Sequence, residues 1–232
     1  MKELSLFTGA GGGLLGTKLL GWECVGYVEQ NKYCCKVLEQ RIKDGFLSDA
    51  PIFCGDIREW IRLGYAASYT GMVDVITGGF SCQPFSSASR GRRVAIDVWP
   101  EMCTVIRIVK PRFVFAENVS GSAISVAATD LKRLGYKTRY TNLSAADLGA
   151  DHIRQRYWLR AYADDESELL STINAKVAGM PQFRQSVWST YPDKSGMADG
   201  MGHRMERFKA IGNGQIPIVA ATAWRILSGN IN

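Results

Sequence analysis

The segment KELSLFTGAGGGLLG, residues 2–16, places a short apolar run, a cluster of glycines and a second apolar run in succession. This order predicts a strand over 3–7, a tight turn, and a helix that begins near Leu14. Glycines at such a turn let the backbone approach a ligand closely, and the N-terminus of a helix favours negative charge. The spacing differs from the dinucleotide fingerprint G-x-G-x-x-G, so a dinucleotide is not the expected ligand; a plain tight turn is the alternative.

Segments typical of strands and helices alternate along the following 150 residues. The expected strands cover 22–29, 52–56, 73–77, 112–116, 138–143 and 157–162, and the expected helices cover 32–43, 99–109 and a segment that closes at 131–134. Such alternation predicts an α/β fold with a Rossmann-like, mainly parallel sheet and helices on both faces. Ligands of these folds lie at the carboxyl ends of the strands.

The alternation stops after residue 162. Residues 163–203 are polar, contain two prolines and carry scattered aromatic side chains. We therefore expect a first domain over 1–162, a separate small and irregular region over 163–203, and a C-terminal segment over 204–232.

Composition limits the functional classes. The net charge of +6 and a pI near 9.0 fit a polyanionic partner without requiring one. Six cysteines without C-x-x-C spacing and only two histidines argue against a metal site. Glycines interrupt the apolar core that a signal peptide would need, and no run reaches the length of a membrane span. We expect an intracellular, cytoplasmic protein with reduced thiols and no membrane association.

Two acids follow the second and third expected strands. Glu29 lies about twenty residues after the glycine turn, where an acid can accept hydrogen bonds from both ribose hydroxyls of a nucleoside. Asp56, in CGDIRE, is expected to end the third strand and to bind an adenine amino group, with Ile57 against the ring. Two solvated acids are the alternative interpretation.

Potentially reactive side chains follow the expected strands 73–77 and 112–116, and others precede the expected strand 157–162. Cys82, in GGFSCQPFSS, follows a strand end, where a loop exposes a thiol. Glu117 directly follows the apolar run VFA, and burial would let it donate a proton near neutral pH. Arg154 and Arg156 alternate at the start of a strand and are expected to point the same way, toward phosphate or a base oxygen. Each has a structural alternative: a packing cysteine, a salt-bridged acid and a surface edge.

These segments together resemble the DNA (cytosine-5)-methyltransferase family, in family order and over nearly the whole chain. FTGAGGG resembles the first S-adenosylmethionine motif, GGFSCQPFS the nucleophile loop, AENV the Glu-Asn-Val motif, Arg154-Gln155-Arg156 the Arg-x-Arg motif, and RMERFKAIGNGQIP (204–217) the closing Gly-Asn motif. Any one match is weak to moderate, but all of them in order is a strong signal.

The resemblance implies the methyltransferase fold, S-adenosylmethionine as methyl donor, no metal, and a function in methylating C5 of cytosine in double-stranded DNA by a monomer. It also implies that residues 1–162 form the catalytic and cofactor-binding domain, that residues 163–203 form a small target-recognition region, and that residues 204–232 return to the catalytic domain. The implied catalytic residues are Cys82, Glu117, Arg154 and Arg156, and the implied cofactor-binding residues are Phe7, Gly9, Gly11, Gly12, Glu29, Asp56, Ile57 and Asn213. DNA contacts are expected from a basic lid with Arg90, Arg92 and Arg93, and from Gln182 and Arg184 in the recognition region.

The chain departs from the family pattern at two positions. Ser81 replaces the usual proline before the cysteine, and Asp151 stands where many relatives carry proline. Family members are commonly longer, and the deficit falls between Arg156 and Arg204. Two alternatives stay open: the same chemistry on tRNA or another pyrimidine, and a catalytically silent relative that only binds DNA. The sequence does not give the recognition site or say whether a restriction enzyme accompanies the chain.

Overall fold

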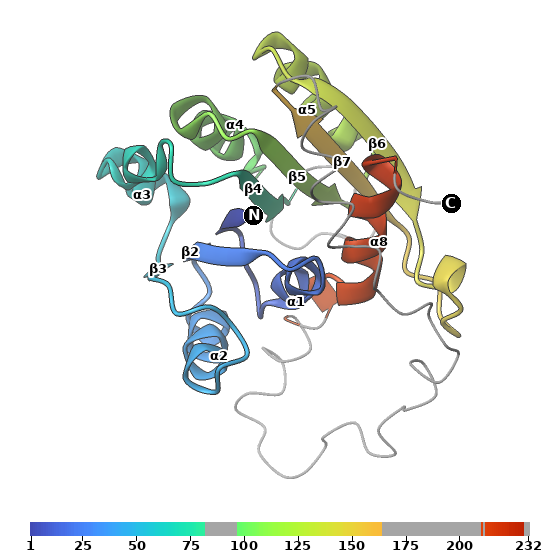
Figure 1. Ribbon diagram of the computed structural model, residues 1–232, viewed down its shortest axis with the longest axis horizontal. Coiled ribbons are helices and arrows are strands. Elements are labelled where there is room, and N and C mark those ends of the chain that lie inside the picture. Colours follow the sequence, from blue (N-terminus) through green and yellow to red (C-terminus); the bar gives the residue numbers. More distant parts are fainter. Residues whose placement is uncertain (82–96, 164–209, 211, 230–232) are drawn as a thin grey trace, which may run out of the picture.

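A seven-stranded sheet forms the centre of the protein, for which the computed structural model describes residues 1–81, 97–163, 210 and 212–229 (Figure 1). The strand order is β3-β2-β1-β4-β5-β7-β6. The strands are β1 (Lys2–Leu6), β2 (Glu23–Glu29), β3 (Ile52–Cys54), β4 (Val75–Gly79), β5 (Phe113–Asn118), β6 (Lys137–Leu143) and β7 (Arg156–Tyr162). Strands β1 to β5 pair in parallel, and β7 runs antiparallel to both of its neighbours. The α/β prediction with a mainly parallel sheet is therefore confirmed.

Helices and short 3-10 turns connect the strands. They are α1 (Gly12–Leu19), α2 (Lys32–Lys43), α3 (Ile57–Arg62), η1 (Tyr65–Tyr69), α4 (Trp99–Val109), α5 (Gly121–Arg133), η2 (Ala146–Leu148) and α8 (Pro217–Leu227). Local chemistry sets several starts: the Asn31 side chain accepts hydrogen bonds from two N–H groups at the start of α2, and Pro217 opens α8 where no amide donor is needed.

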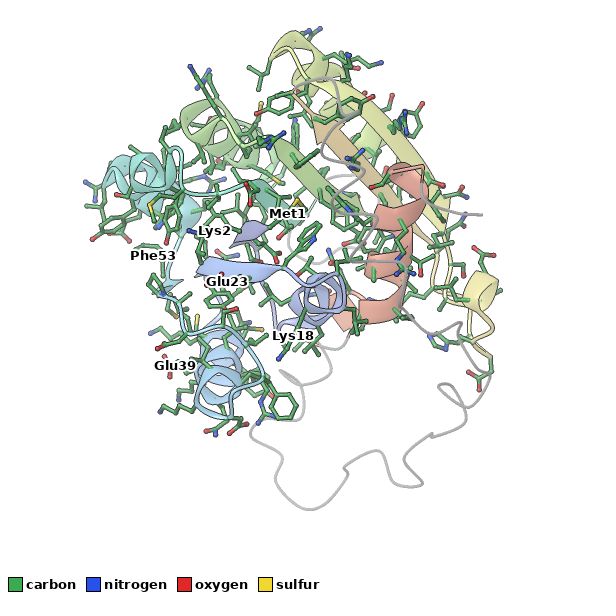
Figure 2. All side chains as sticks on the ribbon, viewed as in Figure 1. Met1, Lys2, Lys18, Glu23, Glu39 and Phe53 are labelled. Carbon is green, nitrogen blue, oxygen red and sulfur yellow. The ribbon has the colours of Figure 1, made fainter. Side chains whose placement is uncertain are left out.

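Alternating side chains of the central strands build two apolar layers. Ile76, Val114 and Ala116 face a core formed with α3, α4 and α5, whereas Val75 and Phe113 face a core formed with α8. A third cluster packs α1 and α2 on β2. This period of two on buried strands explains why both faces of the sheet carry helices. Figure 2 shows Lys18 and Glu39 on the outer surfaces of α1 and α2, away from these layers.

The chain direction brings the ends of several strands to one edge. From β1 the chain proceeds through β2 to β3 on one side, and it continues through β4 to β5 on the other. In such sheets a ligand crevice forms at the carboxyl ends where the order reverses. Helix α8 then packs against α1, so closely that a Cβ on Gly16 would lie 2.6 Å from the Pro217 carbonyl oxygen. The C-terminal segment therefore returns to the first glycine-rich turn (Figure 1).

Several expected strand boundaries are displaced by up to two residues, as in β4, which was expected over 73–77. The displacement that concerns a predicted site residue is at the end of the third strand. Strand β3 ends at Cys54, and Asp56 is the N-cap of α3, where its Oδ1 accepts a hydrogen bond from the Arg58 amide at 2.8 Å. Sequence periodicity missed α3 because it has only six residues. It also missed α8, whose buried residues surround most of the helix and leave no polar stripe. Within the described ranges, no helix has the length and apolar character needed to cross a membrane.

Candidate functional site

The glycine turn after β1 adopts a conformation that most residues avoid. Phe7, Gly9 and Gly11 all have positive φ angles, of 52°, 59° and 90°. Glycine accepts such angles without strain, but a phenylalanine does not, so surrounding contacts must hold Phe7 in place. Gly11 is the N-cap of α1, and the turn thus presents its backbone at the start of that helix.

Glu29 ties this turn to the next helix. Its Oε2 accepts a hydrogen bond from the Gly9 amide at 2.6 Å, and its Oε1 accepts one from the Asn31 amide at 2.7 Å. Glu29 as a whole is 8% exposed. Each oxygen keeps a further lone pair, so Glu29 can still accept a hydrogen bond from a ligand.

The start of α3, just after the third strand, contributes a more open acid. The Asp56 side chain is about half exposed and lies 3.8 Å from the Arg58 guanidinium. Its neighbour Ile57 is 5% exposed and belongs to the core cluster. Asp56 can meet a ligand at the surface, while Ile57 mainly anchors α3.

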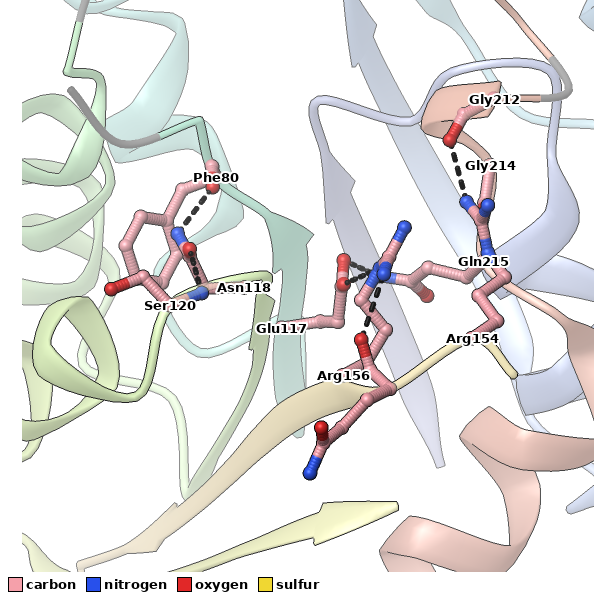
Figure 3. Close-up of polar contacts among 10 residues, drawn as sticks. Phe80, Glu117, Asn118, Ser120, Arg154, Arg156, Gly212, Gly214 and Gln215 are labelled. Atoms are coloured by element: carbon pink, nitrogen blue, oxygen red, sulfur yellow. Dashed lines mark hydrogen bonds and ion pairs between the residues drawn. The ribbon is translucent and has the colours of Figure 1, made fainter. Parts of the chain in front are cut away.

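Glu117 on β5 lies among side chains from distant parts of the chain (Figure 3). Its Oε1 is 3.0 Å from the Arg156 Nε, and its Oε2 accepts a hydrogen bond of 3.3 Å from the Gln215 Nε2. Burial raises the pKa of this carboxyl, and the positive charges of Arg156 and Arg154 and the Gln215 hydrogen bond oppose that rise. Glu117 is a buried acid that its neighbours orient firmly.

Arg154 turns toward the C-terminal segment. Its Nη2 donates to the carbonyl oxygens of Gly212 and Gly214, each at 2.6 Å. Asn213 lies between these two glycines and lines a cavity of about 50 Å3 beneath the glycine turn. The two predicted arginines thus share a region but have different partners: Arg156 the acid, and Arg154 the backbone before α8.

The residues on either side of the predicted nucleophile loop are tethered. The Asn118 Nδ2 donates to the Phe80 carbonyl oxygen at 2.7 Å, and the Val98 amide donates to the Ser81 carbonyl oxygen at 3.4 Å. The chain is thus fixed to β5 at Phe80, two residues before residue 82. Six predicted residues lie outside the described ranges: Cys82, Arg90, Arg92, Arg93, Gln182 and Arg184.

Sequence reasoning missed a buried acid below the site. Glu3 on β1 is 1% exposed, and its two oxygens accept hydrogen bonds from the Thr17 and Thr77 hydroxyls, both at 2.5 Å. Desolvation raises its pKa to about 7, although the two hydroxyls oppose the rise. An acid inside the apolar run KELSLF was the available signal.

Sequence reasoning also assigned no role to Gln215, because nothing local marks a glutamine that contacts residues far away in the sequence. As for metals, no set of three histidine, cysteine or acidic side chains suited to a metal ion occurs among the residues that the structure describes.

Comparison with protein families identifies one match over most of the chain. The model of C-5 cytosine-specific DNA methylases matches residues 1–209. Type II methyltransferase M.AquIA of Picosynechococcus sp. is 30% identical over 181 residues, covering 68% of this chain and 70% of that protein. Type II methyltransferase M.PspPI of Psychrobacter sp. is 33% identical over 146 residues, covering 58% of this chain and 32% of that protein.

Solved structures share the fold. A DNMT2 mutant of Spodoptera frugiperda superposes with a TM-score of 0.55 at 19% identity, covering 72% of this chain and 51% of that chain. A putative DNA modification methyltransferase of a prophage in E. coli gives 0.53 at 23% identity, covering 70% and 47%. The chain thus spans about a third of the length of M.PspPI, 70% of M.AquIA and about half of each of the two solved structures.

Proposed function

Because the chain belongs to the C-5 cytosine-specific DNA methylase family, we propose that it transfers a methyl group from S-adenosylmethionine to C5 of cytosine in double-stranded DNA. The observation that carries this proposal is the arrangement at the end of β5. There Glu117 is buried against Arg156, and the adjacent Asn118 holds the Phe80 carbonyl, two residues before Cys82.

In the proposed reaction Cys82 is the nucleophile. Cytosine C5 is a poor carbon nucleophile, but addition of a thiolate at C6 turns the ring into an enamine with electron density at C5. After C5 has received the methyl group, loss of the C5 proton restores the double bond and breaks the bond between sulfur and C6. Cys82 leaves as the thiolate, and the C5 proton passes to water. The bond that breaks at the donor is the one between the sulfonium sulfur and the transferred methyl group, which leaves a neutral thioether.

Glu117 would act on N3 of the same base. When the thiolate adds at C6, negative charge develops toward N3, and a protonated carboxyl can donate a hydrogen bond or a proton there. Burial favours this role because it raises the pKa of Glu117. Arg156 limits the rise and fixes the carboxyl group, so we assign it a positioning function.

The residues around the glycine turn fit S-adenosylmethionine. When bound, this cofactor supplies an electrophilic methyl group on a sulfonium. An added Cβ at Gly9 would meet no atom within 4 Å, which leaves room for a ligand next to the buried Glu29. Glu29 would accept ribose hydroxyls, the exposed Asp56 would take the adenine amino group, and Asn213 would line the opposite wall.

The target base must leave the duplex before it can reach the site. We propose that Arg90, Arg92 and Arg93 bind phosphates during this step and that Gln182 and Arg184 contact bases. The protein would act as an intracellular monomer. Arg154 is the least direct of the proposed catalytic residues, since its contacts hold the segment before α8.

Transfer of labelled methyl from S-adenosylmethionine tests the proposal when duplex DNA, tRNA and free cytidine nucleotides are assayed in parallel. We expect label only in duplex DNA, at C5 of cytosine. Label in tRNA or nucleotides alone would refute the proposed substrate, and no label in any of the three would refute catalysis by this chain. Bisulfite sequencing of the labelled DNA would then identify the recognition site.

A further inference from the structure

Gln215 contacts both the Glu117 carboxyl and the start of α1. Its Nε2 donates to the Glu117 Oε2 at 3.3 Å. Its backbone and side chain also pack on the start of α1: an added Cβ on Gly12 would collide with the Gln215 carbonyl oxygen, and one on Gly13 with its Oε1. The two glycines therefore create the space that Gln215 fills.

A third glycine opens the other side of this contact. Gly79 ends β4 and is the register partner of Glu117 on β5. An added Cβ there would lie 2.8 Å from the Glu117 Oε2 and 3.0 Å from the Gln215 Nε2. Glycine at this position lets the acid and the amide meet above the strand end.

The backbone before Gln215 is fixed independently. Arg154 donates to the carbonyl oxygens of Gly212 and Gly214, and Pro217 begins α8 two residues later. Gln215 thus lies in a short connection held at both ends, so little conformational freedom remains for its contact with Glu117 (Figure 3).

We propose that Gln215 is a positioning residue that holds the Glu117 carboxyl in place opposite Arg156 and links it to the glycine turn. The proposal rests on the proposed function only in taking Glu117 as the group that meets the base. It goes beyond the Gly-Asn pair of the closing motif, because it assigns a separate role to the side chain that follows that pair.

The contact between Gln215 and Glu117 can be measured through the pKa of Glu117, because few groups act on that carboxyl. Among the described residues, the charged groups that act on it are Arg156 on β7 and Arg154 just before that strand, and Gln215 adds one hydrogen bond from the segment before α8. The amide donor stabilises the ionised carboxylate. Its removal should therefore raise the pKa of Glu117, whereas a side chain that only fills space would not affect that pKa.

The first test follows the Glu117 carboxyl by carbon-13 NMR during a pH titration. In Gln215→Leu, which keeps the volume but loses the amide, we expect the midpoint to rise by about half a pH unit or more. Gln40→Leu is the matched control, because Gln40 donates to the exposed Asp44 on the surface. An unchanged Glu117 midpoint in Gln215→Leu would overturn the proposal.

A second variant tests the proposal if Gln215→Leu does not fold. Gln215→Glu keeps the shape but places a second carboxyl beside Glu117, so the midpoint should rise further than in Gln215→Leu. A midpoint equal to that of the wild type would count against the proposal even if Gln215→Leu cannot be prepared.

Kinetics separate positioning from packing. Loss of one hydrogen bond to a charged group should lower kcat by about tenfold in Gln215→Leu. The KM for the cofactor should stay within about twofold, because the Gln215 carbonyl that packs on Gly12 is retained. In a plot of kcat against pH, the decline of kcat at alkaline pH should move to higher pH. A rise in KM without a change in kcat would contradict the proposal.

The two proposals can fail separately. Wild type that fails to methylate any substrate would refute the proposed function, and the NMR titration would still decide the role of Gln215.

Discussion

The acids on the two sides of β1 are held in different ways. Glu29, at the end of β2, and Asp56, the N-cap of α3, accept hydrogen bonds from backbone amides, including those of Asn31 and Arg58 two residues further on. Glu117, at the end of β5, is held by side chains, and one of them lies 98 residues away in the sequence. The first arrangement is largely local, whereas the second exists only when the C-terminal segment has returned to the sheet.

This difference predicts separable functions. Changes on the side of β2 and β3 should weaken cofactor binding and leave the chemical step intact, because their contacts do not extend to Glu117. Changes on the side of β4, β5 and β7 should slow the chemical step and leave cofactor affinity unchanged. Glu3 connects the two sides, since its partners Thr17 and Thr77 belong to α1 and β4.

The largest expected effect is at Cys82. Replacement by alanine should abolish methyl transfer while S-adenosylmethionine still binds, because the nucleophile is lost and the cofactor contacts are not. Cys54→Ala, which removes an exposed thiol at the end of β3, is the control and should stay active. A duplex with 5-fluorocytosine should trap the wild type covalently, as read by mass spectrometry. Methylation by Cys82→Ala above background would exclude the thiol as nucleophile.

Glu117→Gln should lower kcat by at least about a hundredfold, the usual range for loss of a general acid. The cofactor Kd, measured by calorimetry, should remain within about twofold of the wild type, because Glu29 and Asp56 are unaffected. A large loss of affinity in this variant would show that the two sides of the site are not separable.

Glu29→Ala tests the other side. Removing an acid that we propose to bind the ribose should weaken cofactor binding by roughly 1 to 3 kcal/mol. At saturating cofactor, kcat should be close to that of the wild type. Glu39→Ala on the exposed face of α2 is the control and should bind normally. Affinity within error of the wild type would leave Glu29 with only its structural hydrogen bonds to Gly9 and Asn31.

The smallest expected effect is on the pH dependence of stability and comes from Glu3, which connects the two sides of the site. The pKa of Glu3 is raised from 4.5 to about 7 in the folded protein. The folded state therefore binds more protons than the unfolded state between these values, and stability falls as pH rises through this window. In the wild type the free energy of unfolding should therefore fall between about pH 5 and about pH 7. In Glu3→Gln this fall should be smaller by roughly 1–2 kcal/mol. Urea unfolding at both pH values provides the measurement, and an equal pH slope in both proteins would contradict it.

The sequence predicted the elements whose pattern is strongly periodic. Helices α2 and α4 begin and end at the expected residues, because both are amphipathic and end near recognisable stop signals. Strands β1, β2 and β5 were displaced by no more than two residues. Prediction failed for the six-residue α3 and for the apolar α8, since neither carries a clear helical stripe.

For the candidate site, the sequence determined which acids and arginines follow or precede strands, because each belongs to a short recognisable segment. It placed Glu29, Glu117 and Arg156 near one edge without stating their partners. Only the tertiary structure decided that Gln215 meets Glu117, that Arg154 holds the backbone around Asn213, and that Glu3 lies buried between two threonines. The physical reason is that these contacts depend on chain closure between distant segments, and local propensity and periodicity carry no information about which distant side chains then come within hydrogen-bond distance.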